Sequence, residues 1–158
     1  MKLHNDNLIF SPSDLILFLE SPFASWMEHF GLISPEALDL KDQDDAMMLM
    51  LQDKGAEHES SVLEGLKQQG LTIANIGLSS DKKAATIQAM KEGADVVFQA
   101  CLSQDQFTGF ADFLVRVPGS SQLGDYHYEI WDTKLSKSLQ PYYTIQLCCY
   151  QEMIAAIQ

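Results

Sequence analysis

The chain has 158 residues, of which 46% are hydrophobic and 20% are charged. This composition excludes a disordered tail and predicts a single soluble domain over residues 1–158. The net charge of −12 disfavours unaided binding to nucleic acid, because proteins that grip phosphates usually present a basic surface. No apolar run reaches the roughly 18 residues of a membrane span and no secretory signal opens the chain, so we expect no membrane partner.

Two helices are predicted near the N-terminus. Ser11 is a suitable N-cap, because a proline follows it and Asp14 occupies the capping-box position. Pro22 then interrupts the apolar pattern, and a second short helix is predicted from Phe23 to Phe30. Within it, Trp26 could stack on a base, although we favour burial in the core.

A long helix is predicted in the middle of the chain. The capping pattern recurs at 34–36 and indicates a helical turn, which is followed by an acidic linker. The long helix then runs from Asp44 to about Gln69, and we expect His58 on its apolar face rather than in solvent. Three apolar residues lie at helical spacing from this histidine: Met47, Leu51 and Val62.

Strands and helices follow one another in the second half, which predicts an α/β fold with a helical N-terminal part (1–70) and a sheet core (94–158). The expected elements are an edge strand over 71–76, a helix over 81–93, strands over 94–102, 107–117 and 126–135, and a helix from about 143 to the end. The last two strands are rich in β-branched and aromatic residues. For the segment 118–121 between them, Pro-Gly-Ser-Ser, we predict a turn.

Two acids and a lysine are expected to meet on these last two strands. Asp132 and Lys134 are two positions apart, so on a strand their side chains project from the same face. Asp112 is available from the neighbouring strand. Such a group can hold a divalent metal ion and steady a water molecule beside a phosphate.

Four short motifs occur in a suggestive order. They are Gly55-Ala-Glu-His58 on a helix, Gly109-x-x-Asp112 and Asp132-x-Lys134 on strands, and Gln146-x-x-x-Tyr150 on the last helix. This set resembles the RecB-type branch of the PD-(D/E)XK nuclease superfamily. The resemblance covers 55–150 and implies a restriction-endonuclease-like core, which is a central mixed β-sheet flanked by helices.

The resemblance also implies a role for each residue of the site. Asp112, Asp132 and the backbone carbonyl of Thr133 would bind Mg²⁺ or Mn²⁺, and His58 would reach the metal from its helix. Lys134 would orient or activate the attacking water and stabilise charge that develops on the phosphate. For His58, a core histidine with a hydrogen-bond partner is the alternative interpretation.

Gln146 and Tyr150 are four positions apart and share one face of the last helix. By resemblance, that face approaches the site, where the two residues would position Lys134 or the nucleic-acid backbone. Burial of Tyr150 in the core is an equally open interpretation.

We expect no iron–sulfur cluster. Some members of the family bind one through cysteines, the first of which stands just before the proline between the N-terminal helices. Here that position is Ser21, and a serine hydroxyl does not replace a thiolate on iron. Cys148 and Cys149 lie inside the last predicted helix and are interpreted as packing residues. With Cys101 they make an odd number of cysteines, which disfavours a disulfide framework and favours a reducing, cytoplasmic setting.

Two hypotheses about function follow. The first is a metal-dependent DNA nuclease that acts in DNA repair or processing, with the missing basic surface supplied by another domain or subunit, such as a fused or associated helicase. The second is a catalytically incomplete nuclease-fold domain that binds nucleic acid or protein. Relatives continue the sheet after the last helix, so we expect the domain to be incomplete at its C-terminus, and an unfinished sheet edge would permit homo-oligomers. A mimic of DNA would explain the charge but not the motifs.

Overall fold

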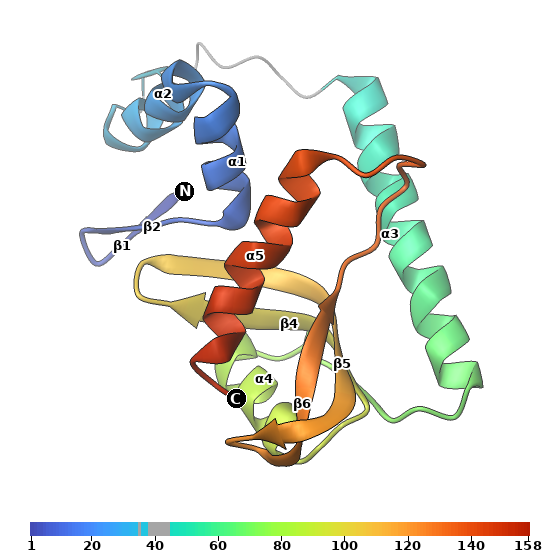
Figure 1. Ribbon diagram of the computed structural model, residues 1–158. Coiled ribbons are helices and arrows are strands. Elements are labelled where there is room, and N and C mark those ends of the chain that lie inside the picture. The colour runs from blue at the N-terminus through green and yellow to red at the C-terminus, as the bar shows by residue number, and fades with distance from the viewer. Residues whose placement is uncertain (35, 38–44) are drawn as a thin grey trace.

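The computed structural model describes residues 1–34, 36–37 and 45–158 (Figure 1). The predicted turn at 34–36 and the acidic linker after it lie partly or wholly outside the described residues. The elements are β1 (Lys2–His4), β2 (Asn7–Ile9), α1 (Pro12–Glu20), α2 (Pro22–Ile33), α3 (Ala46–Gln68), β3 (Ile73–Asn75), α4 (Lys82–Lys91), β4 (Val96–Gln104), β5 (Phe107–Ser121), β6 (Gly124–Trp131) and α5 (Pro141–Ala155).

Strands β3 to β6 form a mixed sheet of four strands in the order β3-β4-β5-β6. Strand β3 pairs parallel with β4, and this arrangement requires a crossover, which contains α4. The β4–β5 and β5–β6 pairs are antiparallel. Helix α5 crosses one face of the sheet, while α3 stands at its side (Figure 1). The prediction of an α/β fold with a central mixed sheet flanked by helices is therefore confirmed.

Two apolar clusters attach the helices to the sheet. Helices α4 and α5 pack against it in the larger cluster, which includes the fully buried Met90, Leu114 and Ile154. Leu63 and Leu66, near the C-terminal end of α3, pack in a second cluster with residues of β4 and β5. Each fully buried side chain of this size stabilises the fold by roughly 1.5–3 kcal/mol. Only the C-terminal half of α3 is therefore anchored to the sheet through buried residues.

Helix α1 begins where the sequence predicts, and α2 begins one residue before the predicted Phe23. The Ser11 hydroxyl accepts a hydrogen bond from the Asp14 amide, and the Asp14 carboxylate accepts one from the Ser11 amide, which completes a capping box. Helix α2 has Ser21 as its N-cap and extends three residues beyond the predicted end at Phe30. Its Trp26 is 54% exposed and stacks on Phe30, so the expectation that this tryptophan is buried in the core was wrong.

A small N-terminal hairpin was not predicted. Strands β1 and β2 have three residues each and are joined through Asn5 and Asp6, which both have positive φ. Strands of this length show no period in the sequence. Backbone hydrogen bonds link Phe10 to Gln106 and Thr108, so the segment after the hairpin is tied to the start of β5.

The boundaries of β5 and β6 differ from the prediction. Segment 118–121 is not a turn, because β5 continues to Ser121 with a register irregularity after Pro118. Strand β6 ends at Trp131, short of the predicted end at Leu135. Continued pairing would place Asp132 opposite Asp112. Instead, the Asp112 carboxylate accepts hydrogen bonds from the amide and hydroxyl of Thr133. This side chain takes the place of the next backbone partner of β6.

The long helix α3 has an exposed N-terminal half. Five apolar residues at its start are each at least 44% exposed: Met47, Met48, Leu49, Met50 and Leu51. In the described ranges of the chain, no helix is long and apolar enough to cross a membrane.

Candidate metal and phosphate site

Strand β5 changes its alternation at Asp112. In a regular strand, odd and even positions face opposite sides of the sheet. Here Ala111 and Leu114 both belong to the core cluster of α4 and α5, whereas Phe113 belongs to the cluster of α3. The regular alternation is therefore interrupted at Asp112, whose charge acts on Glu59 of α3.

The opposite strand β4 has an irregularity at the same level. Its pairing with β5 passes from Phe98 to Ala100 and omits Gln99, which has a φ of 56°. A residue other than glycine in this region costs about 1 kcal/mol or more. The Gln99 side chain leaves the sheet toward α3, where its amide donates a hydrogen bond of 2.7 Å to Glu59. The strained backbone of Gln99 therefore directs this one polar side chain toward Glu59.

The side chain of Asp132 is almost entirely buried. Its side chain is 4% exposed, and its Oδ2 lies 2.7 Å from the Lys134 ammonium. Its other oxygen, Oδ1, is buried without a hydrogen-bond partner among the described residues. Burial raises the pKa of Asp132, the Lys134 ammonium opposes this, and the nearby Asp112 carboxylate raises the pKa further.

Lys134 remains accessible from solvent. Its side chain is 31% exposed, and its ammonium lies 5.6 Å from the centre of the Tyr143 ring. The sequence predicted that strand alternation brings Lys134 beside Asp132. Both residues follow the end of β6, so their contact has another cause. The lysine is held by a carboxylate on one side and can donate to a ligand on the other.

Glu59 is a further acid of the site that the motif comparison missed. Burial raises the pKa of this half-buried group, and the charge of Asp112 adds to the effect, as does that of Asp132. The hydrogen bond from Gln99 and the positive charge of Lys134 oppose it. Glu59 lies four positions before Leu63 and seven before Leu66, which are the residues that pack α3 on the sheet. That spacing could have identified Glu59 from the sequence.

His58 lies on the exposed surface of α3, so the prediction that it points along the apolar face was wrong. The prediction took Met47 and Leu51 as markers of that face, and both are themselves exposed. Its predicted role as a metal ligand stays a prediction.

Tyr150 and Gln146 approach the site from α5. The Tyr150 hydroxyl donates a hydrogen bond of 2.7 Å to the Phe110 carbonyl, and the Gln146 amide donates one of 3.4 Å to that hydroxyl. Tyr150 is only 4% exposed and belongs to the core. A Cβ at Gly109 would lie 2.7 Å from the Tyr150 ring, so the glycine of the second motif permits this packing. Tyr150 thus anchors α5 to β5, and contact of either residue with a substrate stays a prediction.

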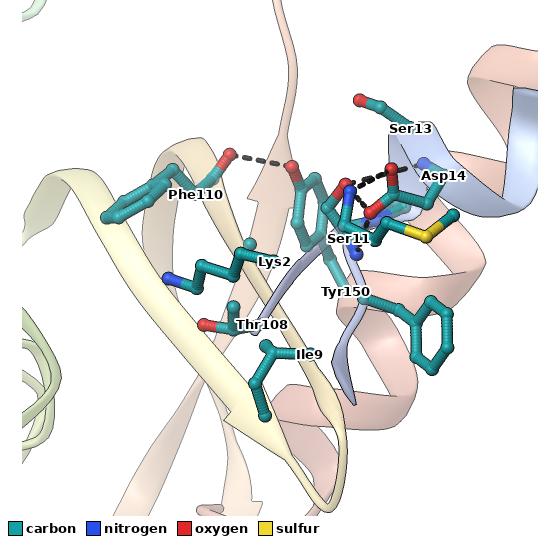
Figure 2. Close-up of a pocket in the computed structure, with 12 residues that line it drawn as sticks. Lys2, Ile9, Ser11, Ser13, Asp14, Thr108, Phe110 and Tyr150 are labelled. Carbon is teal, nitrogen blue, oxygen red and sulfur yellow. Dashed lines mark hydrogen bonds and ion pairs between the residues drawn. The ribbon is translucent and has the colours of Figure 1, made fainter. Parts of the chain in front are cut away.

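A pocket of about 350 Å³ lies next to this tyrosine, but on the side of the N-terminal hairpin (Figure 2). Its lining includes Lys2, Ile9, Thr108 and Phe110. Neither the two site aspartates nor Lys134 lines it. The charged cluster of Glu59, Asp112, Asp132 and Lys134 therefore lies outside this pocket.

The residue types of the charged cluster are compatible with a divalent cation. The described residues contain no ready-made set of three His, Cys, Asp or Glu side chains at metal-binding distances. However, the unpartnered Asp132 Oδ1 is a buried oxygen that a cation would satisfy. The net charge of the cluster is −2 when its three carboxylates, Glu59, Asp112 and Asp132, are ionised and Lys134 is protonated. One divalent cation would balance this charge. Oxygen ligands of this type favour Mg²⁺ or Mn²⁺.

The chain matches no protein-family model, and comparisons with curated proteins and with solved structures also find no match.

Proposed function

We propose that the chain is a restriction-endonuclease-like, RecB-type module that hydrolyses phosphodiester bonds of DNA with the help of Mg²⁺ or Mn²⁺. It would act in DNA repair or processing as part of a larger helicase–nuclease. The observation that supports this most strongly is the pair formed by Asp132 and Lys134 beside Asp112, at the point where β6 leaves the sheet. The order of the four motifs in the sequence supports it independently.

Each residue of the cluster has a chemical task in this proposal. Asp112 and Asp132 would hold the cation, which when bound neutralises phosphate charge and favours attack by water. Lys134 keeps its ammonium beside Asp132 and would donate to a phosphate oxygen, stabilising the negative charge of the transition state. The two hydrogen bonds from Thr133 fix the orientation of the Asp112 carboxylate before substrate arrives.

A second candidate function is a nuclease-fold domain that binds nucleic acid or protein without cleaving it. The net charge of −12 favours this alternative, because the chain has 10 basic residues against 22 acidic ones. Under the nuclease proposal, a basic partner domain or subunit would supply the attraction for DNA.

Cleavage of DNA by the purified chain, with and without a basic partner domain, tests the proposal. The variant Lys134→Ala should lower the cleavage rate by at least about 100-fold in Mg²⁺ or Mn²⁺. Lys137→Ala is the matched control, because it removes a lysine from the same loop without touching Asp132. Equal rates for Lys134→Ala and the parent chain would contradict the nuclease mechanism. DNA binding without cleavage in the parent would favour the binding module.

A further inference from the structure

Two neighbouring residues of α3 differ in their position relative to the charged cluster. His58 is exposed, whereas Glu59 is half-buried and hydrogen-bonded to Gln99 of β4. Adjacent positions on a helix are about 100° apart around its axis, so only one of them can face the sheet. Because Leu63 and Leu66 face the sheet, the facing residue of this pair is Glu59.

We propose that Glu59, and not His58, is the residue through which α3 contributes to the divalent-cation site. Together with Asp112 and Asp132 it provides an all-carboxylate set, and His58 plays no part in binding. This inference rests on the proposed function, since it concerns the same cation. It replaces the imidazole of His58 with the carboxylate of Glu59 in the set of metal ligands.

The contacts of Glu59 leave it able to bind. Gln99 donates to Oε2, and Oε1 has no hydrogen-bond partner in the part of the chain that the structure describes. The Gln99 amide thus orients the carboxylate without occupying both oxygens. The positive φ of Gln99 is the conformation that directs its side chain toward α3, and backbone strain of this kind is typical of functional sites.

A second observation points independently to a ligand at this place. The Asp132 side chain is only 4% exposed, and its Oδ1 lacks a hydrogen-bond partner among the described residues. A buried carboxylate oxygen is costly unless a donor or a cation satisfies it. The charges of Asp112, Lys134 and Asp132 all act on Glu59, so the four groups lie in one neighbourhood.

The ligand set predicts a preference among metals. Three carboxylates without an imidazole are a hard, oxygen-only set, which suits Mg²⁺ and Mn²⁺ and lacks the nitrogen that favours Zn²⁺, Co²⁺ or Ni²⁺. The parent chain should therefore bind Mn²⁺ without the strong preference for Ni²⁺ or Zn²⁺ that a histidine ligand would give.

Titration calorimetry with Mn²⁺ alone, in the absence of DNA, tests the inference on four proteins. They are the parent chain and the variants Glu59→Gln, His58→Gln and Glu57→Gln. Glu57 is an exposed acid on the same helix, paired with Lys54, and controls for the loss of one negative charge. We expect Glu59→Gln to weaken Mn²⁺ binding by about 10-fold or more, and the other two variants to stay within about 2-fold of the parent.

The outcomes separate the inference from the function on which it depends. If the parent binds Mn²⁺ and His58→Gln weakens binding while Glu59→Gln does not, the inference is overturned and the nuclease proposal survives with a histidine ligand. If Glu57→Gln weakens Mn²⁺ binding as much as Glu59→Gln, the loss of one negative charge explains both results, and the inference that Glu59 is a ligand is overturned. If the parent does not bind Mn²⁺, the inference and the metal-dependent function fail together. Unchanged circular dichroism of each variant excludes a folding defect.

Discussion

Asp14 and Asp132 are two largely buried carboxylates with opposite surroundings. Asp14, at the start of α1, receives hydrogen bonds from the N-terminal ammonium and from the amide and hydroxyl of Ser11 (Figure 2). Asp132 has Lys134 at one oxygen, while the other lacks a partner among the described residues. The first carboxylate is satisfied within the fold and the second is not, so Asp14 has a structural role, and the contrast supports the binding role proposed for Asp132.

The pKa values of the two groups shift in opposite directions. Burial disfavours the ionised form of each, but in Asp14 the N-terminal ammonium and the Ser11 hydrogen bonds outweigh burial and hold the pKa below its usual range. In Asp132, burial and the neighbouring Asp112 outweigh Lys134, and the pKa is raised. The difference shows that the number of donors aimed at a carboxylate, and not burial alone, decides whether its charge is stabilised.

The largest expected effect concerns Asp132. The variant Asp132→Asn should weaken Mn²⁺ binding by at least about 100-fold, because it replaces the central anionic ligand with a neutral amide. Its unfolding free energy without metal should be unchanged or higher, since a poorly compensated buried charge is removed. Calorimetry and urea unfolding measure the two quantities. A marked loss of stability with unchanged Mn²⁺ affinity would mean that Asp132 is a structural residue like Asp14.

Asp14→Ala should show the reverse pattern. Loss of the capping box and of the ion pair with the N-terminus should lower the unfolding free energy by about 1–2 kcal/mol. Mn²⁺ affinity should stay within about 2-fold of the parent, because Asp14 lies at the N-terminal pocket and not at the charged cluster. Urea unfolding at neutral pH measures the stability, and weakened Mn²⁺ binding would break the proposed separation of the two regions.

The stability that Asp14 provides should depend on pH. Because its folded-state pKa lies below its unfolded value, the contribution is fully present above the unfolded pKa and is lost as the pH falls through the folded pKa. The unfolding free energies of the parent and of Asp14→Asn should therefore differ at pH 6 and converge toward pH 2. A difference that stays constant over this range would show that the charge of Asp14 is not what stabilises α1.

The smallest expected effect on stability concerns Gln99. In Gln99→Gly, relief of the positive φ should gain about 1 kcal/mol, and the lost hydrogen bond to Glu59 should offset about the same amount. We expect a change in unfolding free energy of less than about 1 kcal/mol, together with weaker Mn²⁺ binding because Glu59 is no longer oriented. Unchanged Mn²⁺ binding would show that the backbone conformation of Gln99 has no function in the site.

Much of the fold could be predicted from local patterns. The strand pair that contains Asp112, the N-cap at Ser11 and the α/β class follow from turn formers, capping residues and apolar periodicity. The nearness of Asp132 and Lys134 was also predicted, although its reason was not strand alternation, because β6 ends before both residues.

The rest depended on interactions that a local pattern does not contain. The end of β6 is determined by the Asp112 carboxylate, which lies 21 positions away from its partner Thr133. The face of α3 was misjudged because its first turns are apolar yet exposed, and only Leu63 and Leu66 show which side meets the sheet. The positive φ of Gln99 occurs at a residue other than glycine, so the sequence did not indicate it, and Glu59 was missed in favour of His58.

The central claim is that a divalent cation binds at the unpartnered oxygen of Asp132. A crystal structure of the chain with Mn²⁺, analysed by anomalous scattering, tests it most directly. We predict a peak about 2.0–2.3 Å from Asp132 Oδ1, with Asp112 and Glu59 as further carboxylate ligands. A Mn²⁺ peak elsewhere would contradict the account. So would a hydrogen bond from a protein donor to Asp132 Oδ1 with no metal beside it.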